Sequence, residues 1–191
     1  MLYAAAGITV MPTSEHADVL ENYALIEALI EMQAWGIASD VLRFSIIEHF
    51  GGVYSDLNYV FERDLEDAVY HYDFFAKEYF VGGMPTNNCF LAAKPKHPIL
   101  KRVTELVARN FGPDKPAYVA ESYDPYAPSF TTVNPLWIAY YQKAHEEGTL
   151  DVLFPKFSTE DDRPGSVALT EYNSGDGYID KDDEVLQDFL N

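Results

Sequence analysis

Cysteine is almost absent from this chain of 191 residues, which contains Cys89 and no other. A single cysteine excludes an internal disulfide and suits a reducing compartment. Long apolar runs are also missing, since no stretch reaches the ~18 residues that a membrane-spanning helix needs. The opening residues, MLYAAAGITVMP, lack the basic segment of a signal peptide. The composition therefore favours neither a disulfide-stabilised scaffold nor a transmembrane protein.

The motifs of several hydrolase classes are missing as well. No serine lies in a G-x-S-x-G motif, and Cys89 has no evident partner base. The five histidines show neither an H-E-x-x-H motif nor any other paired spacing. The sequence therefore predicts no serine or cysteine nucleophile and no zinc site.

Basic residues are scarce, with 13 Lys and Arg against 31 Asp and Glu and a net charge of -18. Such a surface repels phosphate backbones, so nucleic acid is not an expected partner. The same field opposes any anionic substrate. A nucleotide diphosphate can dock only where a metal ion or a few cations reverse the local charge.

The pattern of apolar residues, 48% of the chain, predicts one α/β domain over residues 1–191. Predicted strands cover Tyr3–Met11, Val53–Phe61, Asp73–Phe80, Cys89–Ala93 and Val152–Pro155. Predicted helices follow a cap at Thr13 or Ser14 for about 15 residues, run from Ser39 or Asp40 to Phe50, and cover Ile99–Asn110 and Pro135–Glu147. Trp35-Gly36 is expected to end the first helix, Gly51-Gly52 the second, and residues 158–191 form a polar tail. Strands and helices alternate, which favours a largely parallel or mixed sheet.

Asp40 and Arg43 are the first candidates for chemistry. They stand three residues apart on a predicted helix, so both side chains can point into one site. The arginine offers fixed donors to a phosphate or a sugar hydroxyl, and the aspartate can accept from hydroxyls. The alternative is an ordinary surface ion pair worth only ~0.3 kcal/mol.

Asp56 and Asn58 are the second pair of candidates. They alternate with Leu57, so a continuous strand would place both side chains on the same face near its carboxyl end. Carboxylate and amide oxygens, together with water and diphosphate oxygens, can complete an octahedral Mg²⁺ or Mn²⁺ shell. The alternative for a lone D-x-N triplet is a solvated strand edge or a cap.

The segment Ala38–Asn58, with A-S-D-V-L-R followed by E-H-F-G-G-V-Y-S-D-L-N, resembles the signature of glycosyltransferases with a DXD-containing sugar-binding region. That group includes the large clostridial glucosylating toxins, related bacterial effectors and related mannosyltransferases. Asn88–Pro98 resembles the family's N-x-x-x-x-A-x-P-x-H-P segment, and Thr132–Tyr141 is similar to its later helix start. The resemblance covers residues 35–141.

This resemblance implies a GT-A-like fold, with a mixed sheet flanked by helices, in a compact or N-terminally truncated form. It implies a metal-dependent, retaining hexosyl transfer from a nucleotide-sugar donor to a protein or glycan acceptor. A UDP-sugar is favoured over a GDP-sugar, with Mn²⁺ or Mg²⁺ as the cofactor. The effector-like relatives suggest a bacterial protein delivered into a host cell.

Individual roles follow from the same resemblance. Asp40 and Arg43 would contact the donor sugar and phosphate, Tyr54 would belong to the donor site, and Asn88 would read the sugar. Asp56 would touch the ribose and the metal, and Asn58 would take the main metal-ligand position. Glu171 and Ser174 match an E-x-x-S spacing that supplies further metal ligands in toxin-like members, although a polar turn is the alternative there.

Two departures from the family pattern open a second hypothesis. Asn58 replaces the second acid of D-x-D with a neutral ligand, and only 55 residues precede Asp56. The chain is then a compact variant, a piece of a longer protein, or a degenerate noncatalytic member that binds a sugar or a partner protein. A calcium loop at Tyr172–Asp183 is a weaker reading, because its first position is Tyr rather than Asp.

Overall fold

The computed structural model describes residues 7–57, 59–61, 72–77, 87–117, 119, 129–146, 152–153 and 169–171. Its helices are η1 (Thr13–His16), α2 (Tyr23–Glu31), α3 (Trp35–Phe50), α5 (Pro98–Phe111), the π-helical turn η2 (Ser129–Val133) and α7 (Asn134–Glu146). Its strands are β1 (Gly52–Ser55), β2 (Tyr59–Phe61), β3 (Phe74–Lys77), β4 (Asn87–Ala93), β5 (Val152–Leu153) and β6 (Leu169–Glu171). None of the described helices is both long enough and apolar enough to span a bilayer.

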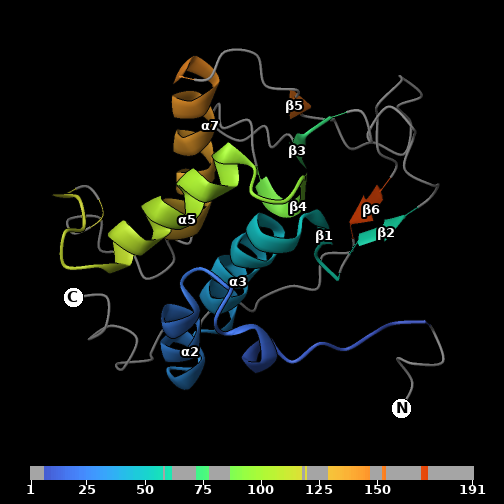
Figure 1. Cartoon of the computed structure of the whole chain (residues 1–191), viewed down its shortest axis with the longest axis horizontal. Helices are drawn as coiled ribbons and strands as arrows, with labels where there is room; N and C mark the ends of the chain where they lie inside the picture. The colour runs from blue at the N-terminus through green and yellow to red at the C-terminus, as the bar shows by residue number, and fades with distance from the viewer. Residues whose placement is uncertain are drawn as a thin grey trace.

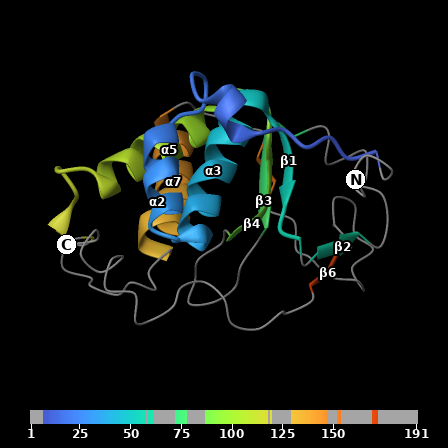
Figure 2. The same ribbon diagram turned by 90° about the horizontal axis from the view of Figure 1, so that it is seen from below.

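The main sheet has four strands in the order β1-β4-β3-β5, and the long helices pack along one of its faces (Figures 1 and 2). Strand β4 runs antiparallel to both β1 and β3, whereas β5 runs parallel to β3. A separate antiparallel pair joins β2 to β6. The predicted mixed sheet with accompanying helices is therefore confirmed.

Helix α3 is central to the helical layer, since it contacts α2, α5, β1 and β4. The helix forms because apolar residues recur at helical spacing along one of its faces. The side chains of this face are buried against the sheet and α5. The buried apolar residues of α3 are Ile37, Ala38, Val41, Phe44 and Ile47. The helix begins at Trp35 rather than at Ser39 or Asp40, because Ile37 and Ala38 already belong to the buried stripe.

The N-terminal predictions were wrong in two respects. Residues 7–11 are not a strand, and Ile8, Val10 and Met11 are exposed there; residues 1–6 lie outside the described part. The first helix is divided into η1, which ends at His16, and α2, which begins only after Asn22, because the left-handed backbone conformation of Asn22 (φ 61°) cannot continue an α-helix. Asn22 Nδ2 donates to Thr104 O of α5 (3.0 Å), so a tertiary contact accompanies this break.

The predicted strand over Val53–Phe61 is two strands in two different sheets. Strand β1 ends at Ser55 after pairing with β4, and β2 begins at Tyr59 to pair with β6. Between them Tyr59 N–H donates to Asp56 O (3.2 Å), which closes a turn. Asp56 therefore follows the last residue of β1, and strand alternation does not determine where its side chain points.

Helices α5 and α7 and strands β3, β4 and β5 agree with the sequence to within a few residues, whereas η2 was not predicted and β6 forms within the segment predicted as a polar tail. Helix α5 starts with Pro98, and the His97 side chain caps it by accepting from Ile99 N–H (3.3 Å). Helix α7 begins at Asn134, directly after η2. The predicted ends of the strands at 78–80 and 154–155, and the tail from residue 172 onward, lie outside the described residues.

The end of α3 is fixed by Gly51, whose φ of 68° favours glycine. Gly51 N–H donates to Ile47 O (2.9 Å), and Lys96 N–H donates to Glu48 O (2.6 Å). A Cβ on Gly51 would lie 2.6 Å from Cδ of Pro95. The residue before β1 therefore needs both the backbone freedom and the small size of glycine.

Gly51→Ala is expected to lower the free energy of unfolding by about 2 kcal/mol more than Gly52→Ala does. Gly52 is the matched control, because its φ is also positive (100°) but nothing lies within 4 Å of an added Cβ. Urea denaturation of both variants measures the difference. Equal destabilisation of the two variants would show that the close approach to Pro95 does not contribute to the free energy of unfolding.

Candidate functional site

Asp40 and Arg43 form a buried ion pair on α3. Arg43 Nη2 lies 2.9 Å from Asp40 Oδ1, and the side chains are only 3% and 2% exposed. The alternative of a surface ion pair is therefore excluded. Burying two charges costs desolvation energy, which is acceptable only when both groups find further partners.

The Asp40 carboxylate finds those partners on two other elements. Its Oδ1 accepts from Asn88 Nδ2 of β4 (2.9 Å), and its Oδ2 accepts from Thr132 Oγ1 of η2 (3.0 Å). Burial raises the pKa of Asp40 above its ordinary value, while Arg43 and the two hydrogen bonds oppose this rise. The carboxylate is thus held by three side chains from three elements.

The Arg43 guanidinium reaches the turn after β1. Its Nη1 lies 3.2 Å from Asp56 Oδ1 and donates to Asn88 O (3.0 Å). On the helix side, Nε and Nη2 donate to Ser39 O and Ser39 Oγ (3.3 and 3.2 Å). The Tyr54 ring covers the guanidinium at 4.4 Å, a distance typical of a cation–π contact. The cation is therefore fixed in position before any ligand arrives.

Asp56 stands where this buried cluster meets solvent. Its side chain is 24% exposed, and its N–H donates to Cys89 O (2.8 Å), which ties the turn to β4. The Tyr54 hydroxyl donates to Asp56 Oδ1 (2.6 Å), and burial, followed by the neighbouring Asp56, raises the pKa of Tyr54 against the opposing effect of Arg43. Because Arg43 and Tyr54 both engage Oδ1, Oδ2 is the oxygen of Asp56 that is better placed to bind a cation.

A metal ion would need oxygen ligands beyond Asp56. The described residues contain no group of three His, Cys, Asp or Glu side chains that could hold one. Asn58 and Ser174 lie outside the described residues. Glu171, however, pairs with Tyr59 in the β2–β6 ladder, so its backbone lies beside the turn that carries Asp56. The donor types at this turn, carboxylate and amide oxygens, fit a hard divalent cation.

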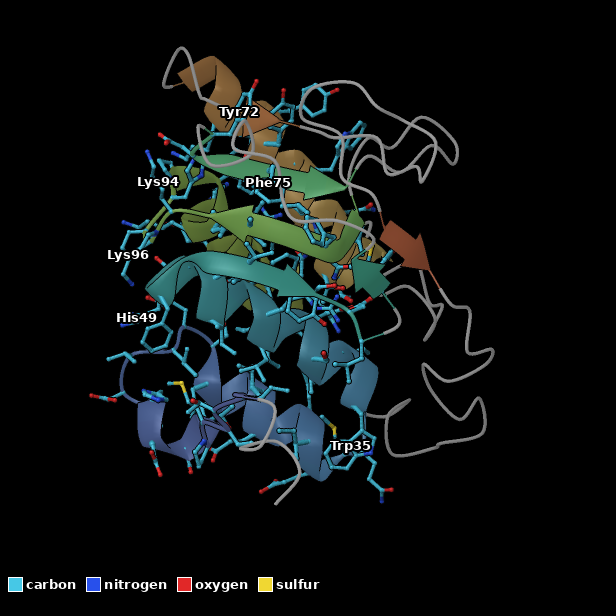
Figure 3. The ribbon with its side chains drawn as sticks, turned by 90° about the vertical axis from the view of Figure 1, so that its right-hand side faces the viewer. Trp35, His49, Tyr72, Phe75, Lys94 and Lys96 are labelled. Carbon is cyan, nitrogen blue, oxygen red and sulfur yellow. The ribbon has the colours of Figure 1, made fainter. Side chains whose placement is uncertain are left out.

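The location of the site follows from the directions of β1 and α3. Figure 3 shows Lys94, Lys96 and His49 at one end of the sheet and Trp35, the first residue of α3, at the opposite end. Strand β1 runs toward the end where Trp35 lies and stops just before Asp56. The start of α3 and the end of β1 therefore meet at the same end of the domain.

The structure brings together five of the predicted site residues: Asp40, Arg43, Tyr54, Asp56 and Asn88. It adds Thr132 and Ser39, which sequence reasoning missed as site residues. Ser39 has a local signal, because it stands one helical turn before Arg43. Thr132 has only its place in the segment that resembles the family's later helix start, 92 positions from Asp40.

Comparisons with known proteins relate this chain to glycosyltransferases. Residues 8–75 match the sequence model of the family described as "Glycosyltransferase sugar-binding region containing DXD motif". The solved structure titled "PaToxG Glycosyltransferase" is similar with a TM-score of 0.51 and 15% sequence identity. The match covers 70% of this chain and 44% of that chain, so this chain spans less than half of its length. No curated protein matches the sequence.

These comparisons bear on two of the predictions made from the sequence. The family match confirms the resemblance to glycosyltransferases with a DXD motif. The structural match supports a GT-A-like α/β fold. At 15% identity this likeness concerns the fold, and the donor and acceptor of the similar protein are not carried over.

The raised pKa of Asp40 generates a prediction about stability. Because the native state holds the Asp40 proton more tightly than the unfolded state does, the wild type should lose stability relative to Asp40→Asn as the pH rises above about 3.8. The difference should become constant once the pH exceeds the native pKa. Urea unfolding of both proteins between about pH 3 and about pH 7 measures it. A wild type that gains stability over Asp40→Asn with rising pH would contradict the assigned direction.

Proposed function

We propose that this chain, whose residues 8–75 match the family of glycosyltransferases with a DXD-containing sugar-binding region, transfers a sugar from a nucleotide-sugar donor to a protein or glycan acceptor. The transfer is metal-dependent and retaining, and the donor is a UDP-sugar in preference to a GDP-sugar. The family match over residues 8–75 and the likeness of the fold support the reaction class. The finer assignments rest on the chemistry of the site.

The observation that carries the proposal is the buried guanidinium of Arg43 between Asp40 and Asp56. A cation fixed by α3, β1, β4 and the turn after β1 is costly to bury, and a hydrophobic replacement would serve stability equally well. Perturbed ionisable groups that converge at one end of a sheet are typical of functional sites. A phosphate that takes the place of one of the present acceptors of Arg43 would meet a donor already fixed in position.

The charges of the site explain why a metal is needed. Arg43 carries one positive charge against two carboxylates, so the three side chains sum to a net negative charge when both acids are ionised. A diphosphate would be repelled by this cluster and by the acidic surface of a chain with a net charge of -18. A divalent cation at Asp56 and Asn58 would reverse the local charge. When bound, it would stabilise the negative charge that develops on the leaving nucleoside diphosphate.

We assign the ligands of that cation to the turn after β1 and to β6. Asp56 and Asn58 supply oxygens from the turn, and Glu171 and Ser174 supply them from the end of β6 and beyond. The register of β6 against β2 supports the inclusion of Glu171, since it brings residues far apart in sequence side by side. An all-oxygen set of this kind suits Mn²⁺ or Mg²⁺.

The remaining residues orient the donor. Tyr54 and Arg43 would meet the ribose and the diphosphate beside Asp56, and a phosphate would reach Arg43 in exchange for one of its present hydrogen bonds. Asp40 and Asn88 are about as deeply buried as Arg43, because Asp40 is 1% exposed, Arg43 3% and Asn88 4%. A sugar hydroxyl can reach Asp40 only in exchange for one of its present hydrogen bonds, so both residues also serve to hold Arg43. Orientation and electrostatic stabilisation are the main tasks in this chemistry.

Asp56→Ala is expected to weaken Mn²⁺-dependent UDP binding by at least about tenfold and to abolish sugar transfer, because it removes a metal ligand. Calorimetric titration of UDP, with Mn²⁺ or with EDTA, measures the binding. Asp73→Ala is the matched control, since it removes the same side chain beside Lys94, at the opposite end of the sheet. Full metal-dependent binding by Asp56→Ala would rule out the assigned site.

Asn58 favours a second candidate function, that of a noncatalytic member that binds a sugar or a partner protein. Asn58→Asp restores the second acid and separates the two functions. In an enzyme this change should tighten Mn²⁺ binding and preserve or increase hydrolysis of the donor, because a charged ligand replaces a neutral one. In a noncatalytic module, neither the wild type nor the variant should hydrolyse UDP-glucose or GDP-mannose at any metal concentration.

A further inference from the structure

We propose that Thr132 is a positioning residue of the donor site: its hydroxyl orients the Asp40 carboxylate, which in turn holds the Arg43 guanidinium toward Asp56. The proposal deepens the function proposed above, because it concerns the same site. Thr132 lies on η2, and no feature of the sequence connects it to α3 by local spacing.

The first support is the geometry of the hydrogen bonds. Thr132 Oγ1 donates to Asp40 Oδ2 (3.0 Å), whereas Asn88 and Arg43 both bond to Oδ1. Thr132 therefore bonds to the carboxylate oxygen that the other two side chains do not contact. Without it, the contacts from Asn88 and Arg43 would hold only one of the two carboxylate oxygens.

The second support is the burial of a polar side chain in an apolar position. Thr132 is fully buried, and it stands four residues before Leu136 and seven before Ala139, which are also fully buried. These three positions form one helical stripe that faces the core. Valine has nearly the same shape, so packing alone does not explain a hydroxyl there, whereas a buried carboxylate that needs a donor does.

Thr104 shows what a buried threonine does without such a role. It is 4% exposed on α5, and its hydroxyl donates to Lys101 O of the same helix (2.8 Å). A local bond of this kind is common for threonine in helices. The bond from Thr132 instead joins η2 to α3 across 92 positions of sequence. Thr104 is therefore the matched control for Thr132.

The π-helical form of η2 fits this role. It runs from Ser129 to Val133 and leads directly into α7, which packs against α5. Single π-helical turns are often found at functional sites. Through Thr132, the position of α7 is linked to the orientation of Arg43.

The test compares Thr132→Val, Thr132→Ser and Thr104→Val with the wild type by two measurements. The first is the rate at which the Arg43 Nε proton exchanges with water, followed by NMR and assigned as the resonance that Arg43→Lys removes. This rate can be measured in the absence of any nucleotide-sugar donor. The second is the affinity for UDP in the presence of Mn²⁺, measured by calorimetry.

Thr132→Val is expected to speed the exchange of the Arg43 proton and to weaken UDP binding, each by about tenfold, since a hydrogen bond to a charged group is lost. Thr132→Ser should restore both values to within about twofold, and Thr104→Val should change neither. A general loss of packing would affect both threonine-to-valine variants alike and would not be rescued by serine.

Two results would overturn the proposal. One is an unchanged exchange rate of the Arg43 proton in Thr132→Val, which would show that Thr132 does not order the guanidinium. The other is faster exchange with unchanged UDP affinity, which would show that this ordering does not serve the donor. If the wild type binds neither UDP nor GDP with Mn²⁺, the proposed function fails instead, and the exchange rate still decides whether Thr132 orders Arg43.

Discussion

The guanidinium of Arg43 is buried between two carboxylates, and much of the arrangement around it follows from the cost of burying that charge. A cation removed from water must direct its N–H groups to acceptors, and those of Arg43 reach Asp40, Asp56, Ser39 and the carbonyl of Asn88. Each acceptor lies on an element that must then be held in place: α3, β4 and the turn after β1. The short β1 and the contact of α3 with β4 are parts of one arrangement around this charge.

The same cluster determines how the site could treat an anionic donor. Its fixed charges do not attract a diphosphate, because two acids outweigh one arginine and the whole chain is acidic. The protein contributes rigidity, since the Tyr54 ring and four hydrogen-bonding partners leave Arg43 little freedom. Charge neutralisation would come from a cation at the exposed edge, where Asp56 remains partly open to solvent. The preorganised interior would orient the donor, and an exchangeable cation at its edge would neutralise the charge of the diphosphate.

Local patterns predicted the elements whose formation depends on local spacing. Helix α5 was predicted almost to its ends because its apolar stripe, its Pro98 start and the glycine after it are all short-range signals. The division of Val53–Phe61 into β1 and β2 was not predictable, because β-branched and aromatic residues favour a strand without showing which partner it pairs with. The left-handed Asn22 was missed for a related reason: it bonds to Thr104, 82 positions away.

The sequence by itself determined which chemical groups are available: the spacing of Asp40 and Arg43 on one helical face, the D-x-N triplet after a glycine pair, and a charge balance that requires a cation beside any phosphate. Only the tertiary structure decided that the ion pair is buried, that Asn88 and Thr132 bond to the two oxygens of Asp40, and that Glu171 is paired opposite Tyr59. The physical reason is that helix and strand periodicity acts over a few residues. Burial and hydrogen bonding across 48 or 92 positions depend instead on how the finished elements pack.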